Sequence, residues 1–178
     1  MTIYGYWSKF TDKELEDILD VIFKKYLGKW DYIDIRSIVK DRTGLAVKVG
    51  LAIKFAKMSK GDLVLPRYKN GYLYFYKWEE EDWTYGLLKI SSRGGQAIIK
   101  ATYLLVALGL KPHDLAVVLA KPKVIAIRPL RDDLEELEAV RDKEKILQKL
   151  RSKFSSVDTV YADDKGKKYR HLLPEFYI

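Results

Sequence analysis

The chain has 178 residues, 48% of them hydrophobic, so it can bury a core as one domain or two small ones and is too apolar to be disordered. It has no cysteine, which excludes disulfide scaffolds, thiolate metal sites and cysteine nucleophiles, and it has no uncharged apolar run long enough to span a membrane. Its net charge of +8 favours a polyanionic partner.

Side-chain amides are scarce, with one Asn and two Gln beside 33% charged residues. This bias accompanies durability in hot-growing organisms, so we expect a thermophilic source, archaeal or an archaeal virus. The first residues lack the basic region and apolar run of a secretory signal. We therefore expect a cytoplasmic protein, or one of the host cytoplasm if the source is viral.

The first predicted element is a helix between Thr11 and Gly28. Thr11 and Glu14 have the spacing of a capping box, and Gly28 is a typical residue after a helix end. One stripe of this helix is apolar and indicates burial: Leu15, Ile18, Leu19, Ile22, Phe23 and Tyr26. An extended arm with Tyr4, Tyr6 and Trp7 precedes it and is expected to fold back.

Residues 34–78 read as two helices and a hairpin. Asp34 caps a short helix that ends at Gly44. A basic helix follows over residues 46–60, and an Asn70-Gly71 turn then joins strands 63–68 and 72–78. Residues 36–77 hold ten cations and two anions, so this segment alone carries +8. Such a local cationic face points to nucleic acid.

The order of these elements resembles the winged helix-turn-helix superfamily over residues 11–78. The resemblance implies an N-terminal winged helix-turn-helix with a three-stranded antiparallel sheet. The pattern of the rest of the chain predicts a C-terminal helix-rich α+β region, so the expected fold class is α+β. The resemblance also implies duplex DNA binding, with the basic helix in the major groove. The predicted DNA-binding residues are Arg42, Lys48, Gly50, Lys54, Lys57, Lys60, Arg67, Lys69 and Asn70.

Two features of this segment allow a second interpretation. Gly50 lowers helix propensity, so either it lets the backbone approach a phosphate or base, or it lets another helix pack closely. Strand alternation places Tyr72, Tyr74 and Tyr76 on one face. If exposed, they form a stacking platform for a single strand; we favour core packing, because tyrosines suit half-buried sheets.

The remainder of the chain is expected to be an α+β region that mediates dimerisation or partner contact. After the acidic turn 79–82 and a third strand to residue 90, we expect a helix from Ser91 or Ser92 to about residue 108. Residues 113–130 fit either a helix and a strand or a hairpin through 121–123. Residues 130–154 are helical with a break near 141–145, and a last hairpin spans 157–173. A second, degenerate winged helix is an alternative for this half.

Catalytic signals are weak. Asp163-Asp164 is more typical of a turn than of a metal site. His113-Asp114 beside Pro112 more often starts an element than forms an acid–base pair, and residues 92–95 match no nucleotide motif closely. We expect no enzyme, metal or cofactor.

These observations predict two domains, 1–90 for nucleic-acid binding and 91–178 for dimerisation. The leading hypothesis is a non-enzymatic, sequence-specific or architectural DNA-binding protein, a transcription regulator or a replication or partition accessory, acting as a homodimer on duplex DNA. One alternative is a single-stranded nucleic-acid-binding protein that uses the aromatic sheet face. The other is a structural or interaction protein without a nucleic-acid role.

Overall fold

Eight antiparallel strands close into a barrel in the computed structural model, which describes residues 3–4, 13–41, 44–138 and 140–152. The strands pair in the order β2-β3-β7-β6-β4-β5-β9-β8, and β8 pairs back onto β2. Their bounds are β2 Tyr32–Asp41, β3 Gly44–Lys48, β4 Leu63–Lys69, β5 Tyr72–Lys77, β6 Leu88–Arg93, β7 Gln96–Lys100, β8 Leu115–Lys121 and β9 Val124–Pro129. A short strand, β1 Ile3–Tyr4, pairs in parallel with β2.

Strand β2 closes the barrel because its two halves pair on opposite sides. Residues 32–37 pair with β8, and residues 38–41 pair with β3. Strands from the two halves of the chain are interleaved around the barrel. Strand β7 lies between β3 and β6, and β9 lies between β5 and β8. Closure gives each of the eight strands a neighbour on both sides, although β4 and β6 pair only through Leu63 with Lys89 and Val64 with Leu88.

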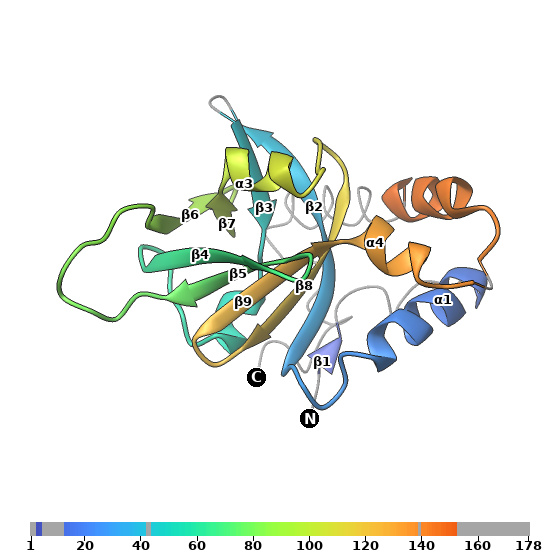
Figure 1. Cartoon of the computed structure of the whole chain (residues 1–178), viewed down its shortest axis with the longest axis horizontal. Helices are drawn as coiled ribbons and strands as arrows, with labels where there is room; N and C mark the ends of the chain where they lie inside the picture. Colours follow the sequence, from blue (N-terminus) through green and yellow to red (C-terminus); the bar gives the residue numbers. More distant parts are fainter. Residues whose placement is uncertain (1–2, 5–12, 42–43, 139, 153–178) are drawn as a thin grey trace.

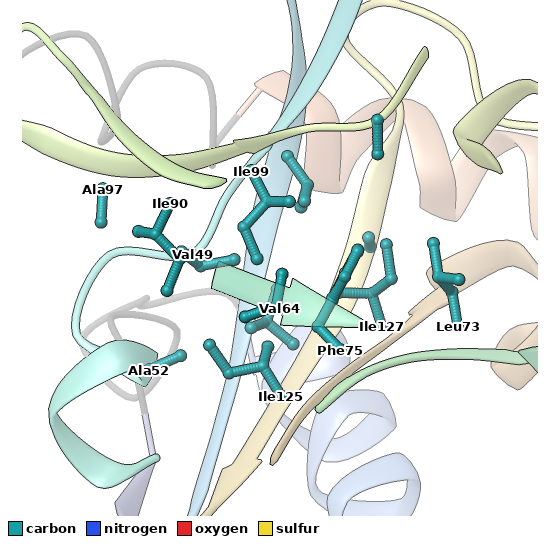
Figure 2. Packing of buried hydrophobic residues seen from close by; sticks show 14 of the residues in the cluster. Val49, Ala52, Val64, Leu73, Phe75, Ile90, Ala97, Ile99, Ile125 and Ile127 are labelled. Carbon is teal, nitrogen blue, oxygen red and sulfur yellow. The ribbon is translucent and has the colours of Figure 1, made fainter. Parts of the chain in front are cut away.

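The barrel interior is filled by one apolar cluster. Figure 2 shows Val64 of β4, Phe75 of β5, Ile99 of β7 and Ile127 of β9 packed against one another, although they lie far apart in the sequence. Each of these four side chains is fully buried. The fold therefore depends on contacts between distant strands, with the short helices α2 Ala52–Phe55 and α3 Thr102–Ala107 adding to the same cluster.

A second apolar cluster lies outside the barrel, where three helices cover one face (Figure 1). These are α1 Lys13–Lys24, α4 Leu130–Glu135 and a helix over residues 143–152. Leu19 and Phe23 of α1 pack with Ile35 of β2 and Val117 of β8. Strands β2 and β8 are therefore buried on both faces, and this explains why the first six residues of β8 are apolar.

The predicted winged helix-turn-helix is wrong. Residues 34–41 form no helix, because they belong to the ten-residue strand β2. A helix here would leave Asp34 and Arg36 near solvent, but the structure buries both at the barrel wall, where Asp34 is 1% and Arg36 is 3% exposed. Their polarity hides the period-2 pattern of a strand. The expectation of a transcription regulator rested on this fold and is withdrawn with it.

The predicted basic helix over 46–60 is also wrong. The segment begins as strand β3 and contains only the four-residue helix α2. Gly50 has a φ of +50°, which no regular helix contains, so it forms a turn between the two elements. Neither interpretation of Gly50 inside a helix holds.

The helix-rich C-terminal region is wrong as well, because the expected helix from Ser91 or Ser92 to about residue 108 is helical only over α3, and its first part belongs to the β6–β7 hairpin. The sequence could not show that Ile98 and Ile99 pair with distant strands. Of the two alternatives for residues 113–130, the hairpin is confirmed, as β8 and β9. The break expected near 141–145 is confirmed as a separation between α4 and the helix over 143–152.

Two locally encoded elements are confirmed. Helix α1 buries Leu15, Leu19, Ile22 and Phe23, as its apolar stripe predicts. The hairpin of β4 and β5 turns at Asn70 and Gly71, with φ values of +52° and +83°. Thr11, Tyr6, Trp7, Arg42, Asp163, Asp164 and the last hairpin lie outside the described residues. No helix in the described part is long and apolar enough to cross a membrane.

Candidate functional site

A ladder of three tyrosines lies on the outer face of β5. Tyr72, Tyr74 and Tyr76 alternate with Leu73 and Phe75, which point into the barrel and are fully buried. The ring centroids of Tyr72 and Tyr74 are 6.0 Å apart, and those of Tyr74 and Tyr76 are 5.9 Å apart with planes 15° from parallel. Tyr76 is 41% exposed, and the other two rings are half-buried. This tyrosine ladder is therefore neither core nor free surface.

Two aromatic side chains from the segment after α1 support the ladder from one side. Trp30 is stacked on Tyr74 with ring centroids 6.3 Å apart, and Tyr26 meets Tyr72 edge-on at 6.4 Å. The hydroxyls of Tyr26 and Tyr72 are 3.0 Å apart. Both supporting rings are buried, so they hold the ladder in place and leave its outward side to solvent.

Cations flank the ladder on both sides. On β4, Arg67 pairs with Tyr74 and Lys69 with Tyr72, and directly paired residues of antiparallel strands project from the same face. On the other side, the Lys121 ammonium lies 4.7 Å from the Trp30 ring centroid and the Arg128 guanidinium carbon 5.2 Å from the Tyr72 ring centroid. A cavity of about 350 Å³ opens here between Lys25, Lys29, Asn70 and the rings. Aromatic faces and positive charge thus share one surface.

An ion network under the ladder fixes part of this charge. Asp133 of α4 is 1% exposed and accepts hydrogen bonds from Arg128 Nη1 at 2.6 Å, from the Tyr26 hydroxyl at 2.7 Å and from Lys25. Glu136, one turn further, binds Arg128 Nη2 at 2.6 Å and Lys25 Nζ at 2.8 Å. The network ties α1, β9 and α4 together, so it sets the position of Tyr26 and Tyr72.

The network also sets the protonation states around it. Hydrogen bonds from Arg128 and Lys25 lower the pKa of Glu136 to about 2. Burial by itself would lower the pKa of Arg128, but the hydrogen bond to Glu136 and the charge of Asp133 outweigh it, and the pKa is raised. Burial and the nearby Asp133 charge raise the pKa of Tyr26, and burial raises that of Tyr74.

The structure separates the predicted DNA-binding residues into groups. Arg67, Lys69 and Asn70 lie beside the tyrosine ladder. Gly50 and Lys60 line a different cavity, which has no lining residue in common with the first. Lys54 lies on α2 and Lys57 just after it, both exposed, while Lys48 is half-buried at the end of β3. Arg42 lies outside the described residues.

Sequence reasoning missed most of the supporting residues. Trp30, Arg128 and Asp133 come from three segments that meet only when the barrel closes and α4 folds over it. The one local signal in the sequence is the alternation of Trp30 and Tyr32 with charged residues, a pattern that is typical of a strand but does not identify the neighbours of that strand.

The other chemical suggestions have structural explanations. Asp114 accepts from the Lys111 amide at 2.9 Å and from Arg151 Nη2 at 2.8 Å, so it holds a turn, and His113 has a φ of +72° in that turn. Residues 92–95 form part of the β6–β7 hairpin. In the described ranges, no three His, Cys, Asp or Glu side chains are grouped so that they could hold a metal ion.

Comparisons of the chain with protein-family models, with curated proteins and with solved structures found no match in any of the three.

Proposed function

We propose that this chain is a non-enzymatic, single-stranded nucleic-acid-binding protein whose binding surface is the tyrosine ladder of β5. The observation that carries the proposal is the half-exposed row of Tyr72, Tyr74 and Tyr76 on a barrel wall, with cations on both sides. Single-strand binders combine these two features, since every base has a stackable face and every nucleotide a phosphate.

The geometry favours a single strand over a duplex. Base faces are covered in a duplex and exposed only when the strand is unpaired. The three rings follow one strand of the sheet, so successive bases can stack along it while Arg67 and Lys69 meet the phosphates. A helix able to enter a major groove is missing from the basic segment as the structure describes it, because α2 has four residues.

Support also comes from the preorganised backing of the ladder. Trp30 and the Asp133 network hold Tyr72 and Tyr74 in place before any ligand arrives. Preorganised rings lose less conformational entropy on binding than free side chains do. Burial of the Asp133 carboxylate has a desolvation cost, which its hydrogen bonds offset. A buried ion network that positions surface rings supports a binding role for those rings.

The experiment is an anisotropy titration of labelled oligonucleotides of one length: single-stranded DNA, single-stranded RNA and duplex DNA, each at two salt concentrations. The proposal predicts tighter binding of a single strand than of the duplex, with a log–log salt slope of about −0.7 per neutralised phosphate. Tyr103→Ala serves as a control, because Tyr103 is 90% exposed on α3 and lies outside the ladder. Tighter binding of the duplex would refute the proposal.

A further inference from the structure

A second cavity, of about 200 Å³, lies between β2, β7 and the segment around α2. The buried side chains of Arg36 and Gln96 line it, and the exposed Lys60, Gly94 and Gly95 are at its mouth. It shares no lining residue with the cavity beside the tyrosine ladder. It is therefore a separate site from the proposed nucleic-acid surface.

The orientation of the Gln96 side chain is fixed by Arg36. Gln96 Oε1 accepts from Arg36 Nη2 at 2.6 Å, and a guanidinium can only donate, so the oxygen of the amide must face it. The other end, Nε2, has no hydrogen-bond partner among the described residues, although Gln96 is only 8% exposed. A buried amide donor without an acceptor costs stability unless something else accepts from it.

Two of the described residues that line the cavity, Arg36 and Lys60, carry positive charge. Arg36 is 3% exposed, and Lys60 Nζ reaches the mouth, where it donates to the Gly95 carbonyl at 3.0 Å. No acidic residue is among the described residues that line the cavity. Asp34 lies behind Arg36, with Oδ2 at 3.9 Å from Nη1, and accepts from the Tyr32 hydroxyl and the Ile35 amide, each at 2.8 Å. The polar side chains of the cavity wall thus present donors and positive charge.

Glycines keep the approach to Arg36 clear. A Cβ on Gly50 would lie 3.4 Å from the Arg36 guanidinium carbon, so any side chain there would stand against the charged group. Gly94 and Gly95 turn the β6–β7 hairpin with φ values of +57° and +82° and add no side chains to the mouth. A Cβ at either position would meet no atom of the described residues within 4 Å.

We propose that this cavity binds the phosphate group of a small phosphate compound. A phosphate offers several acceptor oxygens to donors that come from different directions, here β2, β7 and the segment before β4. Its negative charge matches Arg36 and Lys60, and one oxygen accepts from Gln96 Nε2. The volume is below that typical of drug-sized ligands, which limits the compound to inorganic phosphate, a small ester or the terminal phosphate of a strand.

The side-chain amides give a direct assay, because the chain has only three: Asn70, Gln96 and Gln148. In ¹⁵N-labelled full-length protein they form three resolved pairs of signals, and Gln96→Leu identifies the cavity pair. Titration with inorganic phosphate, against sodium chloride at equal ionic strength, is expected to shift the Gln96 pair saturably and to leave the exposed Gln148 pair in place. Asn70 lies at the tyrosine ladder, so its signals report on the nucleic-acid surface separately.

The charge-reversal variant Lys60→Glu tests the cationic mouth without a buried change, since Lys60 is exposed. It is expected to weaken phosphate binding about tenfold or more, the effect of removing one charge-assisted hydrogen bond. Lys89→Glu, an equally charged change on exposed β6, should leave it unchanged. Two oligonucleotides of one sequence, with and without a 5′-phosphate, separate the sources of phosphate. If the ligand is the terminal phosphate of a strand, only the 5′-phosphorylated oligonucleotide shifts the Gln96 signals. If the ligand is a small compound, neither oligonucleotide shifts them.

Two results would overturn the proposal: no saturable Gln96 shift with millimolar phosphate, or equal shifts of Gln96 and Gln148. Equal weakening by Lys60→Glu and Lys89→Glu would also overturn it, because the effect would then come from net charge. In each of these cases a strand-dependent shift of Asn70 would still support the tyrosine-ladder proposal, so the two failures are distinguishable.

Discussion

Tyr76→Ala separates stacking from packing, with Phe75→Ala as its matched comparison on the same strand. Tyr76 is 41% exposed on the outer face, whereas Phe75 is fully buried in the barrel. Truncating Tyr76 removes mainly its packing against Tyr74, and an aromatic pair contributes about 0.5–1.5 kcal/mol. A large aromatic removed from a core costs about 3–5 kcal/mol. The two substitutions should therefore differ severalfold in their cost to stability.

For a chain of this size, a destabilisation of about 1 kcal/mol lowers Tm by about 2–4 °C. We expect Tyr76→Ala to lower Tm by a few degrees and Phe75→Ala by about 6–20 °C. Removal of one stacking partner should weaken single-strand binding by about 1–3 kcal/mol, which is about 5- to 150-fold in Kd. Thermal unfolding followed by circular dichroism and anisotropy titration measure the two quantities on the same samples. Wild-type affinity in Tyr76→Ala would refute the stacking role.

The remaining predictions concern charge, pH and assembly. Replacing Arg67 and Lys69 by Ala should reduce the log–log salt slope of single-strand binding by about 0.7 for each phosphate that the protein no longer neutralises. Replacing Lys54 and Lys57 by Ala should leave the slope unchanged. The opposite result would place the nucleic-acid surface at α2. Because the pKa of Glu136 is lowered from an ordinary value of 4.5 to about 2, its stabilisation is complete above about pH 5 and disappears as pH falls toward 2. Tm measured against pH should fall less steeply over that interval in Glu136→Gln, and parallel curves would contradict this. If the chain acts as a homodimer, light scattering should give twice its mass of 20.7 kDa at concentrations that saturate an oligonucleotide, and a monomer would exclude the dimer.

Elements encoded by neighbouring residues could be predicted from the sequence. The Asn70-Gly71 turn requires two positive φ values, and only a few residue types adopt them readily, so the β4–β5 hairpin follows from the dipeptide and its flanking strands. Helix α1 follows from its 3.6-residue stripe. The same locality explains why Arg67, Lys69, Asn70 and the tyrosines could be proposed as site residues from the pattern alone.

Elements that depend on barrel closure could not be predicted. Ile35, Ile38 and Val39 fit a helical stripe as well as a strand, and only pairing with β8 and β3 decides for the strand. Likewise, the apolar run of β7 reads as a buried helix until Ile98 and Ile99 meet β3. Trp30 and Arg128 contact Tyr74 and Tyr72 only after distant segments of the chain come together in the barrel. The residues next to them in the sequence do not indicate these contacts.

Photocrosslinking tests the central claim, that a single strand lies on the tyrosine ladder. A single strand with 5-bromouracil at each position in turn would be irradiated with the full-length protein, and the crosslinked peptides would be sequenced by mass spectrometry. We expect the major adducts on Tyr72, Tyr74 or Tyr76, because Tyr76 is exposed and the other two rings are half-buried beside cations. Adducts confined to other aromatic residues, such as the exposed Trp83 and Tyr85 of the loop between β5 and β6, would contradict the claim and place the strand elsewhere.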